Sequence, residues 1–113
     1  MVEIKYLQEF ARQAKALRRK YKSFEVDYNN FLDSIERNPF QGTSLGAGVY
    51  KVRMQITSKR KGKSGGARVM TWVVTEQDDD IIVTLLTIFD KSEFPNVSDR
   101  YIKSLVKEAV SQL

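Results

Sequence analysis

The residues best suited to chemistry are four cations between positions 51 and 91. Lys51 and Arg53 lie two residues apart, and Arg68 follows a run of glycines. Lys91 comes just after a long apolar stretch. Residues 38–75 contain no Asp or Glu, so the first three cations have no acidic neighbour in the sequence. Lysine and arginine side chains bind phosphate groups, and clusters of them attract polyanions. The pattern predicts a site for the phosphate backbone of RNA.

A second group of cations lies in a glycine-rich loop between residues 57 and 67. Glycine permits unusual backbone angles and close approach to a ligand, while neighbouring cations supply charge. We expect this loop to contact RNA, although the loop taken alone favours a solvated hairpin tip. The strand cations have a similar alternative, because long basic side chains reach water easily from a sheet edge. The loop cations are Lys59, Arg60, Lys61 and Lys63.

The composition excludes several classes of site. The 113-residue chain has no cysteine, which excludes disulfide bonds and thiolate metal sites. It also has no histidine, which excludes histidine-based triads, paired-histidine ribonuclease chemistry and the usual zinc ligand sets. We therefore expect no metal and no other cofactor. No apolar run has the length of a signal-peptide core or the roughly 18 residues of a membrane span, so we expect a cytoplasmic protein without a membrane partner.

The N-terminal third of the chain predicts a strand followed by a helical hairpin. Residues 2–7 alternate apolar and polar side chains, as a half-exposed strand does. Residues 8–21 carry apolar side chains at helical spacing among basic ones, which indicates an amphipathic helix. Ser23 is placed to cap a second helix, whose aromatic stripe we expect in the core. The Asn38-Pro39 pair ends this helix, because a residue before proline avoids the α region.

The rest of the chain predicts three strands and a C-terminal helix. Residues 41–48 include three glycines, and we expect a loop there. Residues 50–57 alternate strictly between apolar and polar side chains, which indicates a strand with one cationic face. Residues 68–75 and 81–89 are apolar on both faces, as central strands are. Ser98 is expected to cap the last helix.

The order β, α, α, β, β, β, α predicts one domain over residues 1–113. Its class is α+β, with a small, mostly antiparallel sheet, a helical hairpin and a C-terminal helix. Consecutive strands with short connections form an antiparallel meander. A meander can bring Lys51, Arg53, Arg68 and Lys91 to one side of the sheet, the first two about 6–7 Å apart along their strand.

Three motifs resemble one family. GVYKVR at Gly48–Arg53, GKSGGARV at Gly62–Val69 and LTIFDKSE at Leu86–Glu93 resemble the RelE/ParE superfamily of bacterial type II toxins, and most of all its RelE and HigB branch. The likeness covers nearly the whole chain and implies a RelE-like fold. It also implies a ribosome-dependent mRNA endonuclease that cleaves mRNA by attack of the 2′-hydroxyl and inhibits translation. The partners that it implies are the ribosome, mRNA and an inhibiting antitoxin, expected to be a small helix-turn-helix protein.

The resemblance assigns roles to single residues. Lys51 and Arg53 match the family's paired basic residues, which contact the phosphate, and Lys51 is the candidate general base. Arg68 matches the strand arginine that stabilises charge on the scissile phosphate. Lys91 matches a basic residue that assists the leaving group or the phosphate. The loop cations Lys59, Arg60, Lys61 and Lys63 are assigned to contacts with ribosomal RNA.

One departure from the family leaves other functions open. RelE-like toxins often carry a catalytic tyrosine just after the last strand, whereas this zone reads Ser92, Glu93, Phe94 and Pro95, with Tyr101 inside the next helix. The assignment of proton transfer is therefore the least supported of the roles. A ParE-like gyrase poison shares the same fold and is one alternative. A noncatalytic RNA-binding module, or a toxin that has lost its activity, is the other.

Overall fold

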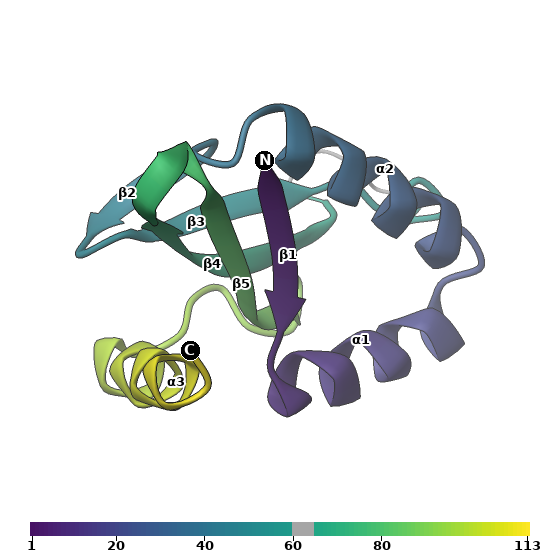
Figure 1. Ribbon diagram of the computed structural model, residues 1–113. Coiled ribbons are helices and arrows are strands. Elements are labelled where there is room, and N and C mark those ends of the chain that lie inside the picture. Colours follow the sequence, from purple (N-terminus) through teal and green to yellow (C-terminus); the bar gives the residue numbers. More distant parts are fainter. Residues whose placement is uncertain (60–64) are drawn as a thin grey trace.

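The computed structural model describes residues 1–59 and 65–113, and within them it shows an α+β architecture. A five-stranded, mostly antiparallel sheet lies between a pair of helices on one side and a third helix on the other (Figure 1). The predicted fold class and mostly antiparallel sheet are therefore confirmed. The helices are α1 (Gln8–Lys20), α2 (Phe24–Arg37), the short 3-10 helix η1 (Gln77–Asp79) and α3 (Asp99–Ser111). The strands are β1 (Val2–Tyr6), β2 (Thr43–Gly46), β3 (Val49–Met54), β4 (Ala67–Thr75) and β5 (Ile81–Asp90).

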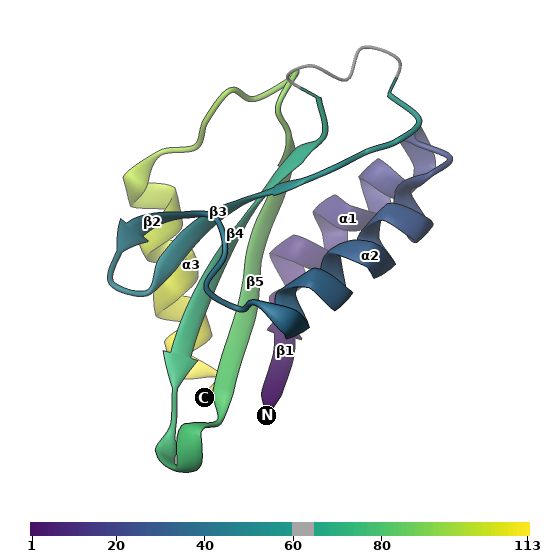
Figure 2. The ribbon, with the colours of Figure 1, turned by 90° about the horizontal axis from the view of Figure 1, so that it is seen from above.

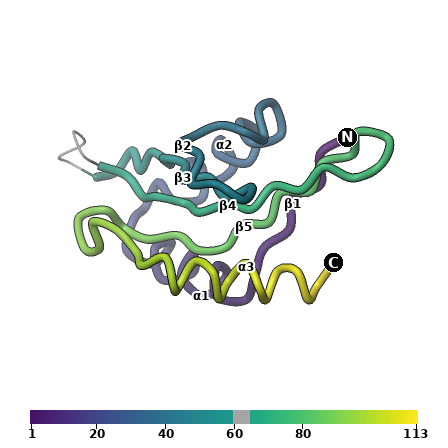
Figure 3. Tube along the Cα trace, turned by 90° about the vertical axis from the view of Figure 1, so that its left-hand side faces the viewer, coloured from purple at the N-terminus to yellow at the C-terminus, as the bar shows by residue number. Residues whose placement is uncertain are grey.

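The strand order across the sheet is β1-β5-β4-β3-β2. The strands β3, β4 and β5 form an antiparallel meander, and β2 pairs with β3 at the outer edge. The strand β1 instead runs parallel to β5, with residues 2–6 opposite residues 81–85. Figure 3 shows the N-terminus beside the β4–β5 hairpin, where the Met1 amino group lies 3.5 Å from the Asp80 carboxylate.

The strand β2 lies within residues 41–48, where the sequence predicts a loop, and that prediction is wrong. All four residues of β2 are exposed, so the segment lacks the apolar alternation that indicates a strand. Backbone pairing defines it instead: Thr43 lies opposite Lys51, and the register shifts between Ser44 and Gly46.

The helix ends follow local hydrogen bonds. The Ser98 hydroxyl accepts a hydrogen bond from the Tyr101 amide at 3.1 Å, so the predicted cap of α3 is confirmed. Ser23 precedes α2 as predicted, but its hydroxyl does not cap the helix and instead donates to Asp27 at 2.6 Å. The helix α2 ends at Arg37, directly before the Asn-Pro pair that was expected to stop it.

Two apolar clusters fill the two sides of the sheet. The larger cluster joins α1 and α2 to the sheet, and the predicted aromatic stripe of α2 lies in it, with Phe24 fully buried and Phe31 5% exposed. The smaller cluster lies under α3 and includes Val49, Met70 and Phe89 of the sheet. Within residues 1–59 and 65–113, no helix combines the length and the apolar character needed to cross a membrane.

A one-residue bulge in β5 decides which way its last residues face. Met70 lies opposite Thr87 and Thr71 lies opposite Leu85, so Leu86 is an extra residue without a partner across the strand. Side chains alternate along a strand, and one extra residue therefore moves all later side chains to the other face. As a result, Asp90 at the end of β5 faces α1, and the preceding residue, Phe89, faces α3.

The buried hydroxyl of Thr71 predicts that a substitution at this position stabilises the fold. Its hydroxyl is fully buried and has no hydrogen-bond partner among the described residues. Thr71→Val removes this unsatisfied group at nearly constant volume, so we expect the free energy of unfolding to rise by about 1 kcal/mol. Urea unfolding measures the change. The matched control is Thr87→Val, because the Thr87 hydroxyl donates to Gln13 at 2.7 Å and its loss should destabilise the fold. Equal effects of the two substitutions would contradict this account.

Candidate nucleic-acid interface

Three of the predicted cations share one face of the sheet. Arg53 lies directly opposite Arg68, and Lys51 lies two residues before Arg53 on β3. Opposite residues point to the same side of a sheet, as do residues two apart on one strand. Lys51 lies opposite Met70, which belongs to the cluster under α3, so all three cations lie on the α3 side. We refer to Lys51, Arg53 and Arg68 as the cationic row.

The cationic row holds positive charge close together. Burial lowers the pKa of Arg68, and the neighbouring charge of Arg53 lowers it further. The Arg68 guanidinium is held in place by its Nη1 atom, which donates to the carbonyls of Ala67 at 3.2 Å and Gly65 at 3.5 Å. In the described part of the chain, neither Lys51 nor Arg68 forms an ion pair with a carboxylate. A bound anion would relieve the repulsion between these cations.

Lys91 lies in the turn that follows β5. Its backbone amide donates to the Gly66 carbonyl at 3.5 Å, so the turn is joined to the residues that lead into β4. Figure 2 shows the end of β5, the start of β4 and the turn together at one end of the sheet. Lys91 is therefore placed at the same end as Arg68, but by a turn and not by strand pairing.

Lys59, which the sequence predicts to contact ribosomal RNA, contacts other residues of the protein. Its Nζ atom donates to Asp90 at 2.8 Å and to the Gly66 carbonyl at 3.3 Å, and only 11% of the side chain is exposed. Its ammonium also lies 5.8 Å from the centre of the Tyr21 ring. The contact with RNA stays a prediction for Lys59, whose ammonium is bound to Asp90 and Gly66 in this structure. The other three predicted loop contacts, Arg60, Lys61 and Lys63, lie outside the described residues.

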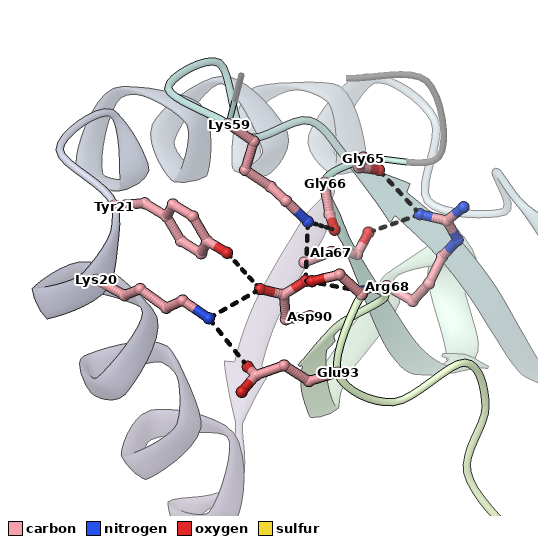
Figure 4. Close-up of polar contacts among 10 residues, drawn as sticks. Lys20, Tyr21, Lys59, Gly65, Gly66, Ala67, Arg68, Asp90 and Glu93 are labelled. Carbon is pink, nitrogen blue, oxygen red and sulfur yellow. Dashed lines mark hydrogen bonds and ion pairs between the residues drawn. The ribbon is translucent and has the colours of Figure 1, made fainter. Parts of the chain in front are cut away.

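Asp90 is the centre of a polar cluster that the sequence did not reveal. Its side chain is 1% exposed, and Figure 4 shows its carboxylate among side chains from the end of α1 and the residue after it, from the segment that follows β3 and from the turn after β5. The Tyr21 hydroxyl donates to it at 2.5 Å, the Ser92 hydroxyl at 2.6 Å, and Lys20 lies 3.6 Å away. Burial raises the pKa of Asp90, but hydrogen bonds from Lys59, Ser92 and Tyr21 outweigh it and hold that pKa well below its ordinary value.

A second buried carboxylate, Asp27, also holds the segment that leads into the basic loop. It accepts hydrogen bonds from the Thr57 amide at 2.7 Å and the Thr57 hydroxyl at 2.6 Å. Burial raises the pKa of Asp27, but the bonds from Ser23 and Thr57 outweigh it and lower that pKa overall. Arg53 and Asp27 line the same pocket, which has a volume of about 220 Å³. Both carboxylates therefore anchor the segment that leads into the basic loop, Asp27 at Thr57 and Asp90 at Lys59.

These two carboxylates predict a loss of stability in acid. Their pKa values are lower in the folded protein than in an unfolded chain, so each stabilises the fold above its unfolded pKa of about 4. This contribution is lost as the pH falls below about 4 toward the folded values. Urea unfolding at neutral pH and at several acidic values should show the decline. Asp90→Asn should lower stability at neutral pH and make the decline shallower; an unchanged slope would contradict the assignment to Asp90.

Two tyrosines near the site are already bound to carboxylates. Tyr21 donates to Asp90, and the Tyr101 hydroxyl donates to Glu9 at 2.6 Å while it accepts from Gln13 at 3.1 Å. Burial and the neighbouring carboxylate raise the pKa of each tyrosine. Neither hydroxyl is arranged to act as the catalytic tyrosine that the resemblance implies.

No protein-family model matches the chain, and no curated protein matches it. Within residues 1–59 and 65–113, no cluster of three or more His, Cys, Asp or Glu side chains is placed to hold a metal ion. The indications of function therefore come from the cationic row, its surroundings and the resemblance of the three motifs.

Proposed function

We propose that this chain is the toxin of a type II toxin-antitoxin system and a ribosome-dependent mRNA endonuclease of the RelE and HigB kind. The observation that carries the proposal is the cationic row: Lys51, Arg53 and Arg68 lie on one face, with Arg53 directly opposite Arg68. Such a row is stabilised by a phosphate backbone, and its residues coincide with those that match the toxin motifs. The proposed partners are mRNA, the ribosome and a helix-turn-helix antitoxin, in the cytoplasm.

The proposed reaction uses a nucleophile from the substrate. The 2′-oxygen of the mRNA forms a bond to the adjacent phosphorus, and the bond from phosphorus to the 5′-oxygen breaks. Lys51 takes the proton of the 2′-hydroxyl in its neutral amine form and becomes an ammonium, and Lys91 supplies a proton to the departing 5′-oxygen from its ammonium form. The products are a 2′,3′-cyclic phosphate and a 5′-hydroxyl end. The protein positions the RNA and moves protons, and these are tasks that basic side chains can perform.

Arg68 is the residue best placed to stabilise the transition state. An arginine stays charged and offers several N–H donors in a rigid plane, which suits phosphate oxygens. The carbonyls of Gly65 and Ala67 hold the Arg68 guanidinium before any substrate arrives. A preorganised cation of this kind stabilises developing negative charge without reorganisation during the reaction.

The test is cleavage of a defined mRNA on programmed ribosomes, followed by mapping of the new ends. We expect cuts that leave 5′-hydroxyl ends, with much weaker cleavage of the same mRNA when ribosomes are omitted. A DNA supercoiling assay with gyrase runs beside it. Inhibition of gyrase without RNA cleavage would overturn the proposal in favour of a ParE-like poison.

One observation favours noncatalytic RNA binding as the second candidate. The hydroxyls of Tyr21 and Tyr101 are bound to carboxylates, so neither replaces the tyrosine that RelE-like toxins often use. Under this alternative the chain would bind ribosomes or RNA with a strong dependence on salt, and the mRNA would stay intact.

A further inference from the structure

Three consecutive carbonyls at the entry to β4 point alternately to two different cations. The carbonyls of Gly65 and Ala67 accept hydrogen bonds from Arg68, whereas the carbonyl between them, on Gly66, accepts from Lys59 at 3.3 Å (Figure 4). We call residues 65–67 the carbonyl segment. Because its peptide units are linked, the orientation of the Gly66 carbonyl constrains the two carbonyls that hold Arg68.

Asp90 holds the Lys59 side chain, which in turn donates to the Gly66 carbonyl of the carbonyl segment. The Asp90 carboxylate accepts a hydrogen bond from the Lys59 ammonium at 2.8 Å. The backbone of Asp90 lies opposite Ala67 in the sheet. The Lys59 and Asp90 side chains are 11% and 1% exposed, so the Lys59 charge depends on Asp90 for compensation, whereas Asp90 also has Lys20 at 3.6 Å. Without the carboxylate, the Lys59 ammonium gains by turning toward water. The Gly66 carbonyl then keeps only the Lys91 amide, at 3.5 Å, as a hydrogen-bond donor.

We propose that Asp90 is a positioning residue for Arg68, acting through Lys59 and the carbonyl segment; this inference rests on the proposed nuclease function. Asp90 and Arg68 lie on opposite faces of the sheet, since Asp90 faces α1 and Arg68 faces α3. Asp90 therefore never touches the substrate. Its effect reaches the phosphate site through the backbone of residues 65–67.

The test compares two substitutions that each remove one carboxylate charge. Asp90→Asn removes the negative charge that pairs with the Lys59 ammonium. Glu9→Gln is the matched control, because Glu9 is also hydrogen-bonded to a tyrosine, at 2.6 Å from Tyr101, but has no contact with the carbonyl segment. Circular dichroism and thermal melting establish that each variant is folded at the assay temperature. The values of kcat and KM are then measured with mRNA on programmed ribosomes.

We expect Asp90→Asn to lower kcat by about 10- to 100-fold with little change in KM, because misplacing a catalytic group by about 1 Å has effects of this size. Glu9→Gln should leave both constants near wild type. Lys59→Met should reproduce the loss in kcat, and Lys59→Arg should restore most of it. A folded Asp90→Asn variant with normal kcat would overturn the proposal, as would an equal loss in Glu9→Gln.

A second measurement does not depend on activity. The side-chain Nε–H signal of Arg68 is followed by NMR in protein labelled with ¹⁵N-arginine and assigned with Arg68→Lys. We expect the signal to shift or broaden in Asp90→Asn and to stay in place in Glu9→Gln. If the wild type cleaves no RNA, the proposed function fails while this comparison still decides whether Asp90 positions Arg68. An unmoved signal in folded Asp90→Asn would reject the positioning role.

Discussion

We expect Arg68→Ala to abolish detectable cleavage of mRNA on programmed ribosomes and to leave the protein folded. Removal of one preorganised hydrogen-bond donor to a developing oxyanion lowers kcat by about 10²- to 10³-fold in enzymes. Arg68→Ala also removes the positive charge of the guanidinium. The fold should tolerate the change, because Arg68 is only half-buried and its removal relieves repulsion from Arg53. The rate of cleavage and the thermal melting curve together test both parts of the prediction.

The control for Arg68→Ala is Arg19→Ala. Arg19 is an exposed cation on α1, and its loss changes the net charge by the same amount. A general electrostatic effect on RNA binding would weaken both variants alike and would be sensitive to salt. Normal cleavage by folded Arg68→Ala would remove Arg68 from the site and with it the main support for the nuclease proposal.

Gly66→Ala should lower the stability of the protein strongly. Gly66 has φ +80°, where a side chain is strained, and a Cβ atom there would lie 2.3 Å from the Met54 carbonyl oxygen. Backbone strain of this kind is worth about 1–3 kcal/mol, and the collision with β3 adds to it, so we expect a loss of about 3 kcal/mol or more. Urea unfolding measures it, and cleavage should fall as well because the carbonyl segment moves.

Gly46→Ala separates the backbone strain of a positive φ from the collision of a Cβ atom with a neighbouring strand. Gly46 has φ +90°, but a Cβ atom there would meet nothing within 4 Å. The substitution therefore carries the strain of positive φ without a collision, and we expect a loss of about 1 kcal/mol. If Gly66→Ala and Gly46→Ala proved equally destabilising, the close approach of residue 66 to β3 would have no energetic importance.

The sequence predicted the elements whose side chains alternate clearly. The strand β3 shows its cationic and apolar faces directly in its sequence, and short connections led correctly to the β3-β4-β5 meander. It did not predict β2, whose exposed residues carry no alternation. The parallel pairing of β1 with β5 was also not predicted, because contacts between residues 2–6 and 81–85 leave no local pattern.

The candidate site was predictable in part for a similar reason. The pairing of Arg53 with Arg68 follows from strand register, which alternation and loop length constrain. The role of Lys59 was not predictable, since its partner Asp90 is 31 residues away and a lysine in a basic loop resembles its exposed neighbours. The Asp-Lys-Ser sequence at Asp90 does carry a turn signal, because an aspartate often accepts a hydrogen bond from the amide two residues on, as it does here from Ser92 at 2.9 Å.

The parallel pairing of β1 with β5 also governs the timing of assembly during synthesis. At the edge of the sheet, β1 has β5 as its neighbour, and β5 is made more than 70 residues later, at positions 81–90. At about 5–20 residues per second, the first strand waits several seconds for its partner. The contact between Lys59 and Asp90 closes at the same late stage. A nascent chain therefore cannot present an anchored Arg68 to the ribosome that is making it until most of the protein has been synthesised.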